Sequence, residues 1–162
     1  MSNDYYNDYI KNGWVESKEI YGIKCQQENN KYMGHFSDIE NENTHINYVL
    51  ANSALKYAQS NNISIACQGQ VIGMGCGQQN RVGCVMLAGN KALNWARRQT
   101  TVAREYWSCL DGKRQEKINN LYDYVTLAKP DIPDFDMVMA SDGFFPFTDN
   151  IELANEYKIK HI

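Results

Sequence analysis

Two short apolar runs, followed at once by a glycine-rich loop, place the strongest constraint on the fold of this chain. Ile63–Cys67 and Val71–Met74 lie on either side of Gln68-Gly69-Gln70, a spacing typical of two strands joined by a tight hairpin turn. The second run continues into the loop Gly73–Arg81, and a helical apolar pattern begins at Val82. The sequence therefore predicts a β-hairpin that leads directly into a helix, as in folds of the α/β class.

Helical periodicity is found on both sides of this hairpin. The spacing of apolar residues predicts a helix over residues 46–58 with Thr44 as its cap, and a second helix that starts at Val82. Residues 98–128 also have a helical pattern, which ends before Pro130. We therefore expect helices before and after the hairpin.

The last part of the chain returns to strand-like patterns. Met137–Ala140 predicts a strand, Ser141–Thr148 a loop, and Asp149 or Thr148 the cap of a short helix that reaches Tyr157. Ile159–Ile162 has the pattern of a further strand, which would complete a βαβ unit. Because such a unit normally receives further cover, we expect the domain to continue beyond these residues.

The N-terminal residues differ from the rest of the chain. They are rich in asparagine, tyrosine and acidic residues, and only Glu19–Cys25 has the pattern of a strand. We therefore predict a poorly structured segment over residues 1–45 and an α/β domain over residues 46–162.

Composition and charge argue against several classes of function. The 162 residues carry a formal charge of −3, so we expect no nucleic-acid partner. The apolar runs are far too short to span a bilayer, and the polar N-terminus has no secretory signal pattern. The 5 cysteines form no CxxC pair and the 3 histidines lack metal-ligand spacing. We therefore expect free thiols in a cytoplasmic protein that holds no metal.

The loop Gly73–Arg81 is the first candidate site. Glycines allow a ligand to approach the backbone and a helix start favours anions, but glycines are also common in ordinary strand-to-helix turns. Asn61 either hydrogen-bonds to a ligand or ends the preceding helix. Arg81 is unfavourable at a helix start, so it either meets a ligand anion or a carboxylate partner, or it is a solvated surface arginine.

The segment Ser141–Phe147 is the second candidate site. It follows a strand end, where ligands gather in α/β sheets. Phe144 and its two neighbouring phenylalanines either pack inward or line a pocket, and Asp149 would by default cap a helix. The residues alone do not decide between these alternatives.

Four segments resemble motifs of one known family. Leu55–Asn61, Gly69–Val82 and Leu87–Lys91 resemble one block of the transformylase half of bifunctional AICAR transformylase/IMP cyclohydrolase. Ala140–Asp149 resembles a later motif of the same region, in the same order along the chain. Together with the helical stretch between them, these motifs extend the resemblance over about residues 46–162, and a fainter resemblance covers Ile20–Gln27.

The resemblance implies a fold and a reaction. The fold would be a cytidine-deaminase-like mixed sheet without zinc, flanked by helices, with a helical insertion at about residues 92–135. The reaction would transfer a formyl group from 10-formyltetrahydrofolate, as co-substrate, to the amine of the aminoimidazole carboxamide ribotide (AICAR) in purine (IMP) biosynthesis. By resemblance, Asn61 and Arg81 would contact the ribotide, and Val82, Phe144 and Asp149 would contact the folate.

Departures from the family pattern limit what the chain would do. The family's catalytic Lys-His pair has no counterpart before Lys160-His161, whose position does not match, so no catalytic residue is assigned. Thr148 stands in place of an arginine and Gly83 in place of a common histidine. The later folate and phosphate segments and the cyclohydrolase domain are absent, so the sequence resembles a transformylase region truncated at both ends.

Three functions therefore remain open. One is a formyltransferase family member that carries part of the site, and another is a non-catalytic remnant that dimerises with, or regulates, a full-length enzyme. The third is an unrelated small-molecule-binding module. The resemblance also implies a homodimer, and we expect apolar surface to be exposed along the last strand and along the helix over residues 46–58.

Overall fold

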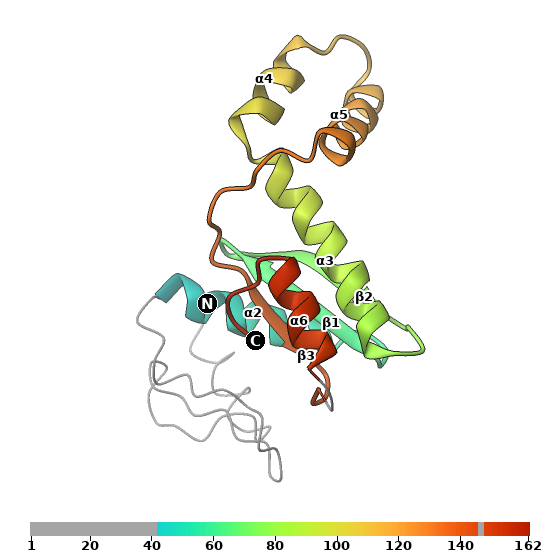
Figure 1. Cartoon of the computed structure of the whole chain (residues 1–162), viewed down its shortest axis with the longest axis vertical. Coiled ribbons are helices and arrows are strands. Elements are labelled where there is room, and N and C mark those ends of the chain that lie inside the picture. Colours follow the sequence, from blue (N-terminus) through green and yellow to red (C-terminus); the bar gives the residue numbers. More distant parts are fainter. Residues whose placement is uncertain (1–41, 146–147) are drawn as a thin grey trace.

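The computed structural model describes residues 42–145 and 148–162, which form an α/β fold (Figure 1). The strand predicted at Glu19–Cys25, and residues 1–41 of the segment predicted to be poorly structured, lie outside the described residues, whereas residues 42–45 of that segment are helical. The helices and strands, in chain order, are α2 (Glu42–Leu55), β1 (Asn62–Cys67), β2 (Gln70–Cys76), α3 (Arg81–Arg98), α4 (Thr101–Cys109), α5 (Arg114–Ala128), β3 (Val138–Ser141) and α6 (Asp149–Glu156). No helix among these residues is both long and apolar enough to cross a bilayer.

A three-stranded antiparallel sheet with the order β2-β1-β3 forms the centre of the fold. Ile65 of β1 pairs with Gly73 of β2 on one side and with Met139 of β3 on the other. The predicted hairpin is confirmed. Gln68 and Gly69 have φ angles of 51° and 74°, the two positive values that a two-residue type I′ turn requires.

The predicted mixed sheet is found only in part. The three strands are antiparallel, and the parallel pairing among the described residues is the isolated bridge between Val138 and His161. The expected last strand, Ile159–Ile162, is therefore reduced to this bridge. The order strand, helix, parallel partner is nevertheless that of the predicted βαβ unit.

Helices cover both faces of the sheet (Figure 1). On one face, Ala51 and Leu55 of α2 pack against Ala66 of β1 and Ala140 of β3. α3 and α6 cover the other face, and the core between them and the sheet includes Ile63, Ile65, Met139, Val85, Ala88 and Ala154. Because both faces are covered, every residue of β1 is buried.

α2 corrects two predictions. It begins at Glu42, so Thr44 is not the cap but lies in the first turn, where its hydroxyl donates to the carboxylate of Asp136. Val49 and Leu55 are buried, whereas Tyr57, after the helix end, is 90% exposed, so the apolar surface expected along residues 46–58 is not found along the helix itself. Along the last segment, Ile159 is buried and Ile162 is 40% exposed, so the apolar surface expected there is found only at Ile162 among these two residues.

α3 lies so close to β2 that side chains are excluded at two positions of the strand. A Cβ atom at Gly73 would lie 2.2 Å from the backbone oxygen of Ala88, and one at Gly75 would lie 2.2 Å from that of Cys84. Helix–sheet packing therefore explains both glycines. Only Gly77, with a φ of 67°, turns the chain towards the helix.

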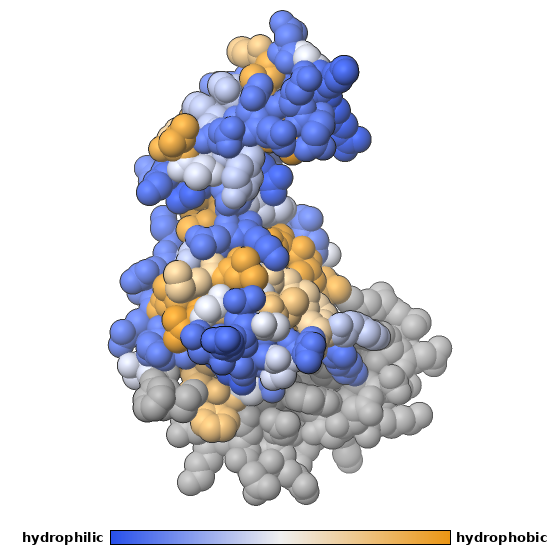
Figure 2. Space-filling model, turned by 90° about the vertical axis from the view of Figure 1, so that its right-hand side faces the viewer, coloured by the Kyte–Doolittle hydropathy of each residue, from blue (hydrophilic) through white to orange (hydrophobic). Residues whose placement is uncertain are grey.

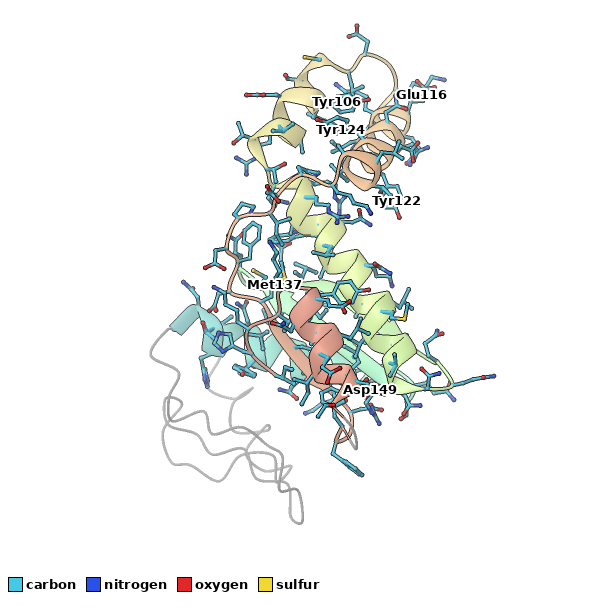
Figure 3. All side chains as sticks on the ribbon, in the orientation of Figure 1. Tyr106, Glu116, Tyr122, Tyr124, Met137 and Asp149 are labelled. Carbon is cyan, nitrogen blue, oxygen red and sulfur yellow. The ribbon has the colours of Figure 1, made fainter. Side chains whose placement is uncertain are left out.

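The helical stretch predicted over residues 98–128 is confirmed as two helices, with Gly112 (φ 110°) in the connection. α4 and α5 lie beyond the C-terminal end of α3, away from the sheet, and the rings of Tyr106 and Tyr124 stack between them at a centroid distance of 4.0 Å (Figures 1 and 3). Figure 2 shows that this pair of helices is mostly hydrophilic, whereas apolar residues gather over the body that contains the sheet. Its assignment as an insertion stays a prediction.

Candidate functional site

One end of the sheet brings the two candidate segments together. Ile63, near the start of β1, pairs with Ser141 at the end of β3, and the backbone N–H of Asp142 donates to the carbonyl of Asn62 at 3.4 Å. α3 begins at the same end, with Arg81 as its first residue. The start of β1, the end of β3 and the start of α3 therefore share one edge, although 80 residues separate Asn62 from Asp142 along the chain.

Arg81 has the carboxylate partner that the sequence left as one of three alternatives. Its Nη1 donates to Asp142 Oδ1 in an ion pair and to the hydroxyl of Ser141 at 3.2 Å. Both charged side chains are 18% exposed. The other guanidinium nitrogen, Nη2, lies over Gly143, where a Cβ atom would come within 2.8 Å of it. The end of β3 and the loop after it therefore hold the side chain of this arginine.

Asp142 accepts hydrogen bonds from two further residues, one in the segment before β1 and one at the start of β1. The backbone N–H of Asn62 donates to its Oδ1 at 3.1 Å, and the side chain of Ser60 is hydrogen-bonded to the same carboxylate. Burial alone would raise the pKa of Asp142, but the hydrogen bonds from Ser60, Asn62 and Arg81, together with the charge of Arg81, lower it below its usual value. The carboxylate is therefore ionised at neutral pH.

Asn61 does not end the preceding helix. That role belongs to Asn62, whose side chain donates to the carbonyls of Leu55 and Ala58 at 3.3 and 2.9 Å. The Asn61 side chain instead donates to the carbonyl of Gln78 at 3.3 Å, in the glycine-rich loop. Its amide thus lies between the start of β1 and the start of α3.

The remaining predicted site residues lie around this edge. Val82 follows Arg81 in the first turn of α3 and is partly exposed. Of the phenylalanines, Phe145 packs against the core, Phe144 is 56% exposed, and Phe147 lies outside the described residues. Asp149 is exposed at the start of α6, next to the cap Thr148, and accepts from the backbone N–H of Asn150 at 2.8 Å (Figure 3).

The only Lys-His pair of the chain lies elsewhere. Lys160 pairs with Asp134 at 2.8 Å, and His161 Nε2 lies 2.7 Å from Asp136 Oδ1. His161 itself forms the bridge to Val138 and Lys160 precedes it, at the opposite end of β3 from Ser141. This pair is therefore not part of the candidate site.

Sequence reasoning missed Asp142 and Ser60. The signal was present for Asp142, an acidic residue directly after a strand end, but an Asp-Gly pair there also marks an ordinary turn. Among the described residues, no three histidine, cysteine, aspartate or glutamate side chains gather as a metal site would require.

Comparison with known proteins gives one consistent family. The model of the AICARFT/IMPCHase bienzyme family matches residues 7–91. Relatives named bifunctional purine biosynthesis protein PurH include that of Prochlorococcus marinus (strain MIT 9312), 36% identical over 107 residues, which are 66% of this chain and 13% of the relative. The protein of strain MIT 9215 is 30% identical over 159 residues, 94% of this chain and 23% of the relative. That of Oenococcus oeni (strain ATCC BAA-331 / PSU-1) is 34% identical over 115 residues, 70% of this chain and 15% of the relative.

These matches span less than a quarter of each relative. The family model alone covers more than half of the chain, from residue 7 to residue 91, and includes the hairpin and the start of α3. The chain belongs to the AICARFT/IMPCHase bienzyme family.

Proposed function

We propose that the chain forms part of an AICAR transformylase site, which moves a formyl group from 10-formyltetrahydrofolate to the amine of the AICAR ribotide in purine (IMP) biosynthesis. The observation that carries this proposal is the meeting of Asn61, Arg81 and the loop after β3 at one end of the sheet. The proposal extends to a cytidine-deaminase-like sheet, a homodimer and a cytoplasmic location.

Each proposed contact suits its chemistry. Arg81 presents a planar set of N–H donors, and the amide of Asn61 both donates and accepts, as a polar ribotide requires. For the folate, Val82 and the exposed ring of Phe144 offer apolar surface to the pterin and aryl groups, and the exposed carboxylate of Asp149 accepts from pterin N–H groups.

The catalytic step needs groups that these residues do not supply. Formyl transfer requires a base for the proton of a weakly nucleophilic amine and a cation that faces the oxyanion. Lys160 and His161 are paired with Asp134 and Asp136 at the other end of β3. Losing either function typically costs about 10²–10⁴ in rate, so we expect the chain alone to bind ligand without measurable turnover.

The test is a calorimetric titration of the full chain with the ribotide and, separately, with a 10-formyltetrahydrofolate analogue. Arg81→Ala should weaken the ribotide on the order of 10- to 150-fold, the equivalent of one charge-assisted hydrogen bond. Arg98→Ala is the matched control, because Arg98 ends the same helix and donates to the carbonyl of Asn94. Binding that is insensitive to Arg81→Ala would contradict the assigned site.

A second assay follows tetrahydrofolate formation from both substrates. Turnover by the chain that is lost in an Asn61→Ala, Asp149→Ala double variant would refute the expected inactivity. If the chain binds neither ligand but associates with a full-length family enzyme, the alternative holds, namely a non-catalytic remnant that dimerises with or regulates that enzyme.

A further inference from the structure

The carboxylate of Asp142 lies at the centre of the candidate site. Its Oδ1 accepts from Nη1 of Arg81 and from the backbone N–H of Asn62, and the side chain of Ser60 is bonded to the same group. Ser60 and Asn62 are the neighbours of Asn61 on either side. A single side chain therefore contacts Arg81 and both chain neighbours of Asn61.

We propose that Asp142 is a positioning residue that holds the guanidinium of Arg81, and the backbone on both sides of Asn61, in the geometry that binds the ribotide. This inference rests on the function proposed above. Within the described residues, the hydrogen bonds of Arg81 all use Nη1, towards Ser141 and Asp142. Nη2 and Nε of Arg81 therefore keep their donors for a ligand, while the contacts of Nη1 fix the plane in which they point.

The position of Arg81 explains why it needs such a partner. The N-terminal end of a helix carries partial positive charge, so a cation at the first helical residue is repelled by the helix itself. The first turn of α3 contains no acidic residue that would offset this repulsion. Asp142 provides the missing negative charge from another element. Without it, we expect the guanidinium to leave its place over Gly143 for solvent.

Asp142 has two opposite effects on an anionic ligand. It orients Arg81, which favours binding, and it offsets the charge of Arg81, which opposes binding. If Asp142 is a positioning residue, removing its charge weakens the binding of the ribotide. If Asp142 instead competes with the ligand for the guanidinium, removing its charge strengthens that binding. An unoriented arginine must be ordered by the ligand, a cost equivalent to a roughly three- to tenfold loss of affinity.

The experiment compares the parent chain with Asp142→Asn, which keeps the shape of the side chain and an oxygen at the Oδ1 position. Two quantities are measured at neutral pH. One is the affinity for the ribotide, and the other is the rotation of the Arg81 guanidinium in ¹H–¹⁵N spectra without ligand, with the Arg81 signals assigned by their loss in Arg81→Lys. Asp134→Asn is the control, since it removes a carboxylate that pairs with Lys160 away from the site.

We expect restricted guanidinium rotation in the parent and in Asp134→Asn, and free rotation with a three- to tenfold weaker ribotide in Asp142→Asn. Unchanged or tighter ribotide binding in Asp142→Asn, or a freely rotating Arg81 in the parent, would overturn the positioning role. A parent chain that binds no ribotide would instead refute the proposed function, and the rotation measurement would still decide whether Asp142 holds Arg81.

Discussion

Replacing Gly75 by alanine tests whether close packing of α3 on β2 sets the geometry of this domain. The new Cβ atom would lie 2.2 Å from the carbonyl oxygen of Cys84, and 3.1 Å from the backbone nitrogen of Ala88. A carbon and an oxygen in ordinary contact are about 1 Å further apart than the first distance, so α3 must move away from the strand by a similar amount. Neither contact atom belongs to a side chain that can rotate away.

The expected loss of stability follows from two opposing effects. Overpacking at a rigid contact costs about 3 kcal/mol, at the upper end of its usual range. Alanine also reduces the freedom of the unfolded chain, which returns about 1 kcal/mol. We therefore expect the free energy of unfolding to fall by about 2 kcal/mol in Gly75→Ala, measured by urea denaturation with tryptophan fluorescence.

The control is Gly77→Asn, at a glycine with a φ of 67° and no atom within 4 Å of its Cβ position. Asparagine tolerates this conformation, so the change should stay within about 0.5 kcal/mol. Truncating the opposing side chain by Cys84→Ala should not relieve the effect of Gly75→Ala, because the contact is with the backbone. A Gly75→Ala chain as stable as the parent, or rescue by Cys84→Ala, would refute the packing argument.

Two further predictions concern other parts of the domain. Gly89→Ala would place a Cβ atom 2.4 Å from the ring of Tyr157, so it should lower the free energy of unfolding by about 1–3 kcal/mol. Because this contact is with a side chain, and not with the backbone as at Gly75, adding Tyr157→Leu should partly restore the stability measured by denaturant unfolding. Burial raises the pKa of Asp136, but hydrogen bonds from Thr44 and His161 and the charges of His161 and Lys160 lower it overall. The folded-state pKa of Asp136 thus lies below its unfolded value. The ionised carboxylate should therefore contribute fully to the free energy of unfolding above about pH 4, and this contribution should disappear as the pH falls through the folded-state pKa. We expect Asp136→Asn to be less stable than the parent at pH 6, with a difference in unfolding free energy that shrinks towards pH 3. A difference that is constant between pH 6 and pH 3 would contradict the assignment.

Local signals in the sequence predicted most elements of the fold. The hairpin depended on residues 68 and 69 adopting positive φ angles, and the start of α3 followed from the apolar pattern after Asn80. Such features involve neighbouring residues, so one sequence is enough to identify them. The helix over residues 46–58 was predicted too, but its start was wrong.

The errors concern contacts between residues far apart in the chain. Thr44 has a good capping residue type, but its hydroxyl is used by Asp136, 92 residues away. Gly73 and Gly75 were read as part of a ligand loop because nothing local indicates that α3 lies against them. Asp142 was passed over for the same reason, since its partners lie at residues 60–62 and 81. Only tertiary structure distinguishes such residues from ordinary turn or cap residues.

The arrangement of α4 and α5 has a consequence for how members of this family can differ from one another. Among the described elements, these two helices pack on each other and on α3, and not on the sheet. Their folding therefore depends on α3, whereas the sheet and the end of α3 that carries Arg81 do not depend on them. Insertions, deletions and rapid sequence change are tolerated best in such a segment. The stacked tyrosines and the connection at Gly112 can thus diverge between lineages without any compensating change around Asn61 and Arg81.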